Sequence, residues 1–259
     1  MPSIQYHGST RSTVSRHTAS RTIDTAAGLN PAKTARDITA SKRYSKYTPE
    51  ELLLINQAIG DYKKYADRVY IFEGVGDIGA AKVRACVERH KNLTERTPVI
   101  IVDYLQLLAP YDVRATDKQN MDKSVLELKR ISRDFKTPVI AISSMNRNNY
   151  LTPVDFESFK ESGGIEYTAD IITGLQLDCM NEDLFSKKEN IKAKRDRVKQ
   201  AKAETPRKVE LVILKNRSGK TGQSVHFDYY PAYNLFRERS DFTSAPPGTP
   251  FLSENMKSM

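Results

Sequence analysis

An acidic residue, Asp103, follows directly on the aliphatic run Val99-Ile100-Ile101-Val102. Uninterrupted rather than alternating hydrophobicity predicts a strand that is buried on both faces of a parallel sheet. Open α/β sheets bind their ligands at the carboxyl ends of such strands, which is where Asp103 lies. A carboxylate in that place can hold Mg²⁺ through water beside nucleotide phosphates. The alternative is that Asp103 only caps a helix or a turn.

Two cations, Lys215 and Arg217, are spaced so that both lie on one face of a strand, directly before a turn that contains Gly219 and Gly222. Two positive groups beside a γ-phosphate stabilise the negative charge that spreads over its oxygens in the transition state. The alternative is a hairpin whose tip carries solvated cations. The spacing by itself leaves both readings open.

Two glycine-containing motifs suggest nucleotide binding, and both are incomplete. A P-loop needs Gly-x-x-x-x-Gly-Lys followed by Ser or Thr. Gly219-Lys220-Thr221 has the last three letters, but Leu214 stands where the first glycine is needed. The segment Gly74-Val75-Gly76-Asp77-Ile78-Gly79 has the letters of a dinucleotide fingerprint, which would indicate a nicotinamide-dependent enzyme. However, no ribose-binding acid follows a strand at the expected distance.

The elements that position these residues alternate between strands and helices. A helix start is predicted at Thr48, with Pro49 in the first position and Glu51 three residues after the cap. Apolar residues at helical or strand spacing predict further helices and strands. The predicted helices cover residues 48–62, 78–90 and 121–135. The predicted strands cover residues 69–72, 99–103, 138–142, 170–177, 209–214 and 224–230, the last two forming a hairpin. The fold class is α/β, with a parallel sheet and helical crossovers.

The composition divides the chain into three parts. Residues 1–47 predict a basic, weakly ordered segment, residues 48–239 an α/β domain, and residues 240–259 a tail. Within the domain, residues 187–208 are dense in Lys and Arg. Their mixed charges allow an exposed helix or a loop, and we expect the loop. Its candidate contacts to a nucleic-acid backbone are Lys192, Lys194, Arg195 and Arg197.

The formal net charge is +9, from 41 Lys and Arg against 32 Asp and Glu. This excess favours a polyanionic partner, although a solvated basic surface would also explain it. No apolar run approaches the roughly 18 residues that span a bilayer, and the N-terminus lacks the apolar stretch of a secretory signal. Cys86 and Cys179 fit reduced thiols in a cytoplasmic protein. The composition therefore favours a protein without a membrane span and with reduced thiols over a disulfide framework.

Four segments, taken in order, resemble the motor domain of DnaB-type replicative DNA helicases. The run Val102 to Leu108 resembles the Walker B motif, and Val139 to Arg147 resembles the next strand motif. Phe159 to Glu166, followed by Ala169-Asp170, is similar to the Arg-Glu-Ser-Gly segment, and Leu214 to Gly222 is similar to the family's hairpin. Four motifs that occur in the family's order between Val99 and Phe236 are far more specific than any one of them.

The resemblance implies a RecA-like ATPase domain, incomplete at its N-terminal end, that moves along single-stranded DNA in a ring and uses ATP and Mg²⁺. It implies that Asp103 holds the metal and that Gln106 belongs to the same nucleotide-binding motif. Ser144 stands where the family usually has a glutamine that senses the γ-phosphate. The remaining implied roles fall to two groups of residues. The DNA channel is lined by Lys160, Glu161 and Gly163, and the nucleotide of a neighbouring subunit is reached by Lys215 and Arg217.

The sequence lacks the P-loop and the catalytic glutamate that the family carries upstream of these motifs. We therefore expect the isolated chain to hydrolyse ATP at no more than background rate. A truncated gene and one half of a split motor both fit this absence. The chain then acts within a homo-oligomeric ring or with full-length helicase subunits. The alternative function is a non-catalytic DNA-binding or regulatory subunit that pairs with a complete helicase.

Overall fold

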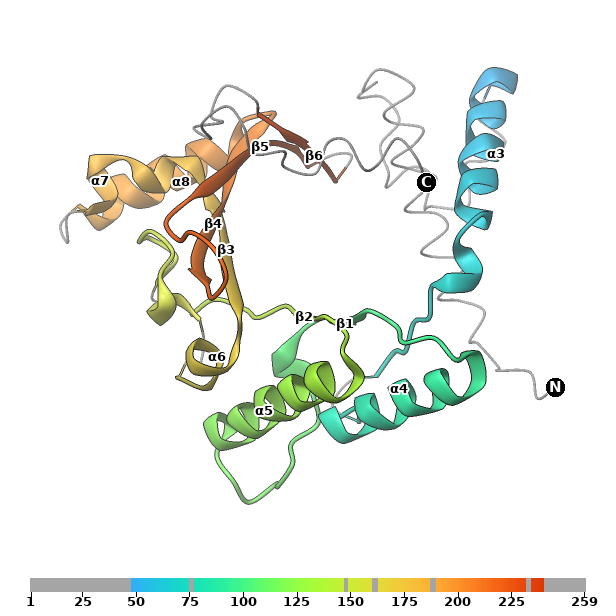
Figure 1. The fold of residues 1–259 in the computed structure, drawn as a ribbon. Coiled ribbons are helices and arrows are strands. Elements are labelled where there is room, and N and C mark those ends of the chain that lie inside the picture. The colour runs from blue at the N-terminus through green and yellow to red at the C-terminus, as the bar shows by residue number, and fades with distance from the viewer. Residues whose placement is uncertain are drawn as a thin grey trace.

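The computed structural model describes residues 48–74, 77–146, 149–159, 163–186, 190–231 and 234–239. The α-helices in chain order are α3 (Pro49–Lys63), α4 (Ala80–Thr94), α5 (Asp117–Phe135), α6 (Gly163–Thr168), α7 (Asp183–Ser186) and α8 (Ile191–Ala203). The strands are β1 (Ile100–Val102), β2 (Val139–Ala141), β3 (Ile171–Leu177), β4 (Arg207–Asn216), β5 (Ser224–Tyr230) and β6 (Leu235–Glu238). Short 3-10 helices lie between them, namely η2 (Ala66–Arg68), η3 (Leu105–Leu107), η5 (Phe156–Ser158) and η6 (Asp178–Asn181). Figure 1 shows α3 standing apart from the two sheets.

The strands β1 and β2 form a parallel pair in which Ile100 faces Val139 and Val102 faces Ala141. Helices α4 and α5 lie together beside this pair (Figure 1). Ile100 and Val102 are buried against them, whereas Ile101, which points to the opposite face, is 66% exposed. Strand geometry sends successive side chains to opposite faces, so one face of the pair forms the core.

Helix α5 supplies most of the helical side of that core. Its buried apolar residues recur at helical spacing, as predicted, and are Met121, Val125, Leu128 and Ile131. The helix begins at a capping box in which the hydroxyl of Thr116 accepts from the backbone of Gln119, while the side chain of Gln119 accepts from the backbone of Thr116. It ends where Lys136 adopts the left-handed conformation, at a φ of 50°.

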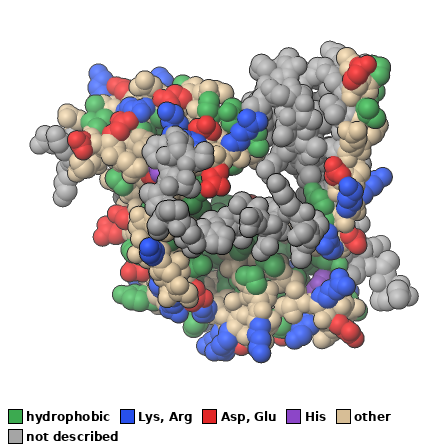
Figure 2. Space-filling view, turned by 45° about the horizontal axis from the view of Figure 1, so that its top comes forward, with side chains coloured by type: hydrophobic (Ala, Val, Ile, Leu, Met, Phe, Trp, Pro, Cys, Tyr) green, Lys and Arg blue, Asp and Glu red, His purple; other side chains and the backbone are tan. Residues whose placement is uncertain are grey.

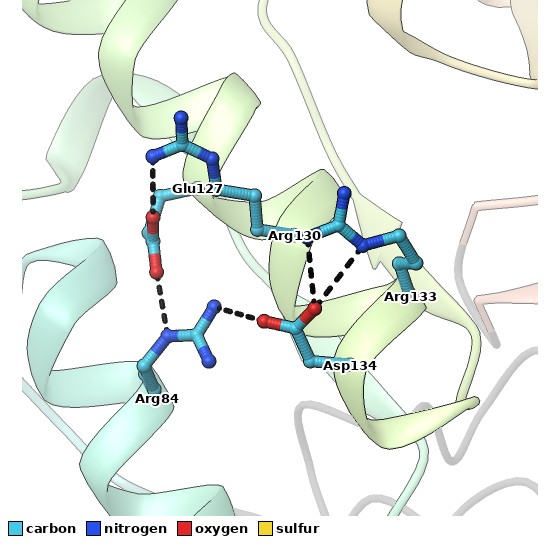
Figure 3. A network of polar contacts seen from close by, with 5 residues as sticks. All are labelled: Arg84, Glu127, Arg130, Arg133 and Asp134. Carbon is cyan, nitrogen blue, oxygen red and sulfur yellow. Dashed lines mark hydrogen bonds and ion pairs between the residues drawn. The ribbon is translucent and has the colours of Figure 1, made fainter.

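Ion pairs join α4 to α5 along the edge of the core (Figure 3). The Arg84 guanidinium donates to Glu127 Oε1 at 2.6 Å and to Asp134 Oδ2 at 2.9 Å. Arg133 also donates to Asp134, and Arg130 lies 3.5 Å from Glu127 Oε2. Hydrogen bonds from Arg84 raise its pKa, and the hydrogen bonds from Arg84 and Arg133 lower the pKa of Asp134. The network fixes how the two helices lie on the sheet.

A second sheet is antiparallel and has the order β3-β4-β5-β6. Its central hairpin pairs β4 with β5 from Arg207↔Tyr229 to Val212↔Ser224. Ile172 on β3 is buried in the same cluster as β1 and α5, so the two sheets share one core. The hairpin agrees with the prediction, and β4 extends to Asn216 at its far end.

The basic segment 187–208 is not a loop, because residues 191–203 form helix α8. Lys, Arg, Gln and Ala are strong helix formers, and no Gly or Pro interrupts them. The helix also buries apolar surface, since Val198 and Ala201 pack in a small cluster with Cys179, Met180 and Phe185. The prediction of a loop from the high density of Lys and Arg is therefore wrong for residues 191–203.

Three strand predictions were also wrong. Residues 69–72 form no strand, which removes the strand that a dinucleotide fingerprint beginning at Gly74 requires. Burial of β1 and β2 on both faces was predicted, but Ile101 and Ile140 are exposed, because α4 and α5 pack on the other face. Hydrophobic side chains gather in the hollow at the centre of Figure 2. In addition, β3 pairs antiparallel with β4 instead of joining the parallel strands.

The helices predicted at residues 48–62 and 78–90 correspond to α3 and α4. Helices begin at Pro49 and Ala80, and both cysteines are free thiols. Residues 1–47 and 240–259 lie outside the described residues. Among the described helices, none combines the length and the apolar composition that crossing a bilayer requires.

Candidate functional site

The carboxyl ends of β1 and β2 meet at one edge of the sheet, and the predicted nucleotide residues lie there. Asp103 follows β1 directly, and Ser143 and Ser144 stand two and three residues beyond the end of β2. The parallel pairing continues past the strands, because Ile142 N donates to Val102 O and Leu105 N donates to Ile142 O, both at 2.9 Å. The structure therefore brings the two chain ends together, as a parallel sheet requires.

Gln106, in η3, connects the two segments through its amide group. Its Nε2 donates to Ser143 Oγ at 3.0 Å, and its Oε1 accepts from Ser144 N at 3.2 Å. With both ends of the amide engaged, the side chain fixes the turn after β1 against the turn after β2. The immediate role of Gln106 is thus to position Ser144. The peptide bond between Asp103 and Tyr104, just before η3, is cis.

Asp103 is suited to hold a divalent cation. Its side chain is exposed at the edge of the sheet and makes no ion pair or hydrogen bond with any other described residue. A carboxylate that is accessible and not neutralised by a nearby cation offers the hard oxygen ligand that Mg²⁺ takes. Ser144, which follows β2, is also exposed and carries a hydroxyl that can face a phosphate.

Lys215 and Arg217 lie together at the far end of the hairpin and contact α6. Lys215 Nζ donates to Glu166 O at 2.5 Å, and the Arg217 guanidinium donates to Tyr167 O at 2.9 Å. Arg217 also pairs with Asp170, with 3.1 Å between Nη1 and Oδ1. Both cations thus lie where helix α6 exposes its last carbonyl groups, which attract positive charge.

Asp170 connects this pair to α5, and its role was missed by the sequence reasoning. Its carboxylate accepts from Lys129 Nζ as well as from Arg217. The hydrogen bond from Lys129 lowers the pKa of Asp170, and the charges of Lys129, Arg217 and Lys215 act in the same direction. The signal was present in the Ala169-Asp170 motif, but no spacing in the sequence links it to Lys129, 41 residues earlier.

The two groups of predicted residues are not brought together within this chain. Among the described residues, Lys215 and Arg217 bond to α6 and Asp170, not to Asp103, Gln106 or Ser144. If the two cations act on a nucleotide that a different subunit binds, they are expected to lie away from Asp103 of their own chain, as they do here.

Helix α6 and the segment before it pack closely against α5 and β3. A Cβ on Gly164 would lie 2.2 Å from Asp122 Oδ1 on α5, and a Cβ on Gly174 in β3 would lie 2.4 Å from Val154 Cγ2. Val154 N also donates to Gln176 Oε1 at 2.6 Å. Gly163, a predicted DNA contact, begins α6. The other two predicted contacts of that segment, Lys160 and Glu161, lie outside the described residues.

Helix α8 separates the four predicted basic contacts into two kinds. Lys192 and Arg195 are exposed. Lys194 is only 4% exposed, its Nζ donates to Phe185 O at 3.3 Å, and it lies 5.9 Å from the centre of the Phe185 ring. Arg197 makes a forked contact with Glu182, at 2.6 to 3.1 Å. The structure therefore does not support Lys194 and Arg197 as DNA contacts, because both are used inside the fold.

A cluster of metal-ligand types lies elsewhere, across the second sheet. Ligand atoms of Asp178, Glu210 and His226 lie within 4.8 Å of one another. Each carboxylate faces a different ring nitrogen of His226, Asp178 at 3.3 Å from Nδ1 and Glu210 at 3.8 Å from Nε2. Arg239 already pairs with Asp178 at 2.9 Å. A single ion would use one ring nitrogen, so this geometry fits a buried polar network better than a metal centre.

The chain is similar in sequence to known proteins. The profile of the family described as "DnaB-like helicase C terminal domain" matches residues 33–238. The chain is 29% identical over 218 residues to the replicative DNA helicase DnaB of Geobacillus stearothermophilus, covering 80% of this chain and 42% of that protein. It is also 29% identical over 215 residues to the replicative DNA helicase DnaC of Bacillus subtilis (strain 168), with the same coverage. The chain thus spans less than half the length of these relatives.

Solved structures share the fold. A DnaB-like replicative helicase, whose structure is described together with its interactions with primase, superposes with a TM-score of 0.64 at 21% identity, covering 90% of this chain and 48% of that one. A second structure, described as an ATPase domain, has a TM-score of 0.64 at 23% identity, with 84% and 68% covered. The RecA-like fold expected from the sequence is therefore confirmed. Because the family profile spans most of the chain, this chain belongs to the DnaB-like helicase C-terminal domain family.

Proposed function

We propose that this chain is part of the ATP-driven motor of a replicative DNA helicase, in which it works within a ring of subunits on single-stranded DNA. The observation that carries the proposal is that the candidate residues form two separate groups. One group lies at the carboxyl ends of β1 and β2 around Asp103 and is called the Asp103 edge. The other consists of Lys215 and Arg217 at the end of the hairpin and is called the finger. ATP with Mg²⁺ supplies the phosphoryl chemistry at such an edge. Family membership supports this reading over a nicotinamide-dependent enzyme.

Asp103 would hold the metal, Gln106 would keep Ser144 in position, and Ser144 would face the γ-phosphate. A serine hydroxyl is shorter than the glutamine side chain that the family usually carries there, so we expect its contact to be made through water. Gly163 and its neighbours Lys160 and Glu161 would contact the DNA backbone. Lys160 carries a point charge and lacks the forked geometry of arginine.

The finger would act on a nucleotide bound by the neighbouring subunit. Its cations stabilise charge only as the phosphoryl group transfers, so their loss affects turnover more than nucleotide binding. In the isolated chain Arg217 is engaged by Asp170 and Tyr167 O. Reaching a neighbour's phosphate therefore requires Arg217 to exchange these contacts for the γ-phosphate oxygens. Both Arg217 and Asp170 are about half exposed, so water weakens this ion pair and the exchange costs little.

The test uses a companion helicase subunit that has its own P-loop and catalytic glutamate but has lost its finger by mutation. Adding this chain should restore part of the companion's ATPase activity. Arg217→Ala should abolish the restored activity, because removing such a finger costs about 10³ or more in turnover. Lys215→Ala should weaken it.

Lys220→Ala is the matched control, since Lys220 is exposed in the same turn and has no predicted contact with phosphate. It should leave the restored activity unchanged. Equal activity with wild-type chain and Arg217→Ala would exclude the finger. A chain that binds the companion and lowers its activity would instead indicate a regulatory subunit.

A further inference from the structure

Four cations form a straight stripe along helix α8. Lys192, Arg195, Lys199 and Lys202 follow one another at intervals of three, four and three residues, and all are exposed. At about 100° per residue these positions fall within an arc of about 80° on one side of the helix. Among the described residues, none of the four side chains makes an ion pair or a hydrogen bond.

The opposite side of α8 uses its residues inside the protein. Val198 and Ala201 pack against Cys179, Met180 and Phe185, Lys194 is buried, and Arg197 pairs with Glu182. The cations of this helix are therefore sorted by face. Those that face the fold are enclosed or paired with an acid, and those of the stripe are exposed to solvent. Asp196 is the single acid of α8 and lies beside the stripe.

The dimensions of the stripe suit a nucleic-acid backbone. The ten residue steps from the first to the last cation span about 15 Å of helix at about 1.5 Å per residue. One strand of nucleic acid carries a phosphate about every 3.4 Å along a stacked helix, so the stripe faces about four or five phosphates. Each phosphate that a cation neutralises releases condensed counterions, which is the main source of affinity for such a surface.

We propose that the outward face of α8, formed by Lys192, Arg195, Lys199 and Lys202, is a sequence-independent binding site for the phosphate backbone of single-stranded nucleic acid. The site is separate from the Asp103 edge. In Figure 1, α8 lies at the end of the antiparallel sheet, far from α4 and β1. Figure 2 shows Lys and Arg side chains, with acidic ones between them, over this part of the surface.

A membrane surface is the competing polyanion, and the composition of α8 does not favour it. Helices that bind in the plane of a membrane insert an apolar face beside their basic residues. Here Val198 and Ala201 are used inside the fold, and Ile191 at the start of the helix is the exposed large apolar residue of α8. The choice of nucleic acid rests on the proposed function, since the family acts on DNA. The stripe itself follows from the structure alone.

The experiment measures the binding of a fluorescently labelled oligothymidylate of about 20 nucleotides by anisotropy over a range of NaCl concentrations. The stripe variant combines Lys192→Gln, Arg195→Gln, Lys199→Gln and Lys202→Gln. The control variant combines Lys82→Gln, Arg89→Gln, Lys118→Gln and Lys123→Gln, which removes the same net charge from exposed positions of α4 and α5. Circular dichroism melts of all three proteins check that the fold is retained, and duplex DNA and anionic vesicles are further arms.

We expect the stripe variant to raise Kd for the oligonucleotide about tenfold or more at low salt and to reduce the slope of log Kobs against log[NaCl] by about 3, since each single-strand contact contributes about 0.7. The control variant should stay close to wild type. Equal effects of the two variants would overturn the proposal in favour of net charge alone. If the stripe variant bound the oligonucleotide as wild type does and lost binding only to anionic vesicles, or only to duplex DNA, the proposal would be overturned in favour of that partner. The ATPase assay with Arg217→Ala does not depend on this binding measurement, so the stripe proposal and the proposed function can fail separately.

Discussion

Gly174 in β3 offers a sharp test of how the loop before α6 is fastened to the sheet. A Cβ at this position would lie 2.4 Å from Val154 Cγ2 and 2.9 Å from Val154 Cγ1. Both distances are well below a normal contact, and Val154 is only 7% exposed, so its methyl groups have nowhere to move. Gly174→Ala therefore forces the loop away from the strand, and overpacking of this kind costs about 1–3 kcal/mol.

The measurement is the free energy of unfolding from urea denaturation of Gly174→Ala, Val154→Ala and the double variant. Val154→Ala removes the two methyl groups that the new Cβ meets. We expect the double variant to be as stable as Val154→Ala alone, which gives a favourable coupling of about 1–3 kcal/mol between the two sites. Gly60→Ala in α3 is the control, because a Cβ there meets nothing within 4 Å and should stabilise the helix by about 0.5–1 kcal/mol.

A stability of Gly174→Ala within about 0.5 kcal/mol of wild type would refute the reasoning, since surface-like substitutions fall in that range. The reasoning would also be refuted if the losses of unfolding free energy in the two single variants simply added up in the double variant. Either result would mean that the loop moves away from β3 without resistance.

Two further predictions concern charged contacts. Arg84→Leu should lower the free energy of unfolding by about 1–2 kcal/mol, because it leaves Glu127, which is 14% exposed, without its closest hydrogen-bond donor. A double-mutant cycle with Glu127→Gln should show that the costs of the two single changes do not add. The pKa of Asp170 is lowered in the folded chain by Lys129, so its contribution to stability is complete above the unfolded value of about 3.9 and is lost as the pH falls through the lower folded value. The stability difference between wild type and Asp170→Asn should accordingly shrink from about pH 5 to about pH 3, and a difference that does not change with pH would contradict the pairing.

The elements that the sequence predicts best are those with a strong local signal. The apolar residues of α5 recur at helical spacing, and Pro49 marks the start of α3, so both helices are found from periodicity and capping alone. The Asp103 edge follows as well, because a buried strand that ends in an acid has a defined place in a parallel sheet.

What the sequence could not predict depends on contacts between distant residues. The burial of Lys194 is decided by Phe185 and the cluster under α8, and nothing in a run of Lys and Arg indicates which of them turn inward. The ion pairs of Asp170 join α5 to the hairpin, and that proximity exists only after folding. The pairing of β3 with β4 was misread because a continuous apolar run does not distinguish parallel from antiparallel neighbours.

The single amide group of Gln176 has a mechanical consequence. Its Oε1 accepts from Val154 N in the loop before α6, and its Nε2 donates to Glu210 Oε1 in β4, the strand that carries Lys215. A carboxamide is rigid, so the two bonds cannot be shifted independently. We expect force applied at the finger to be transmitted through β4 and Gln176 to the loop, so that the hairpin and the loop at Val154 move as one body. Replacing Gln176 with Leu would remove both bonds, while the packing of Val154 against Gly174 would still hold the loop on β3.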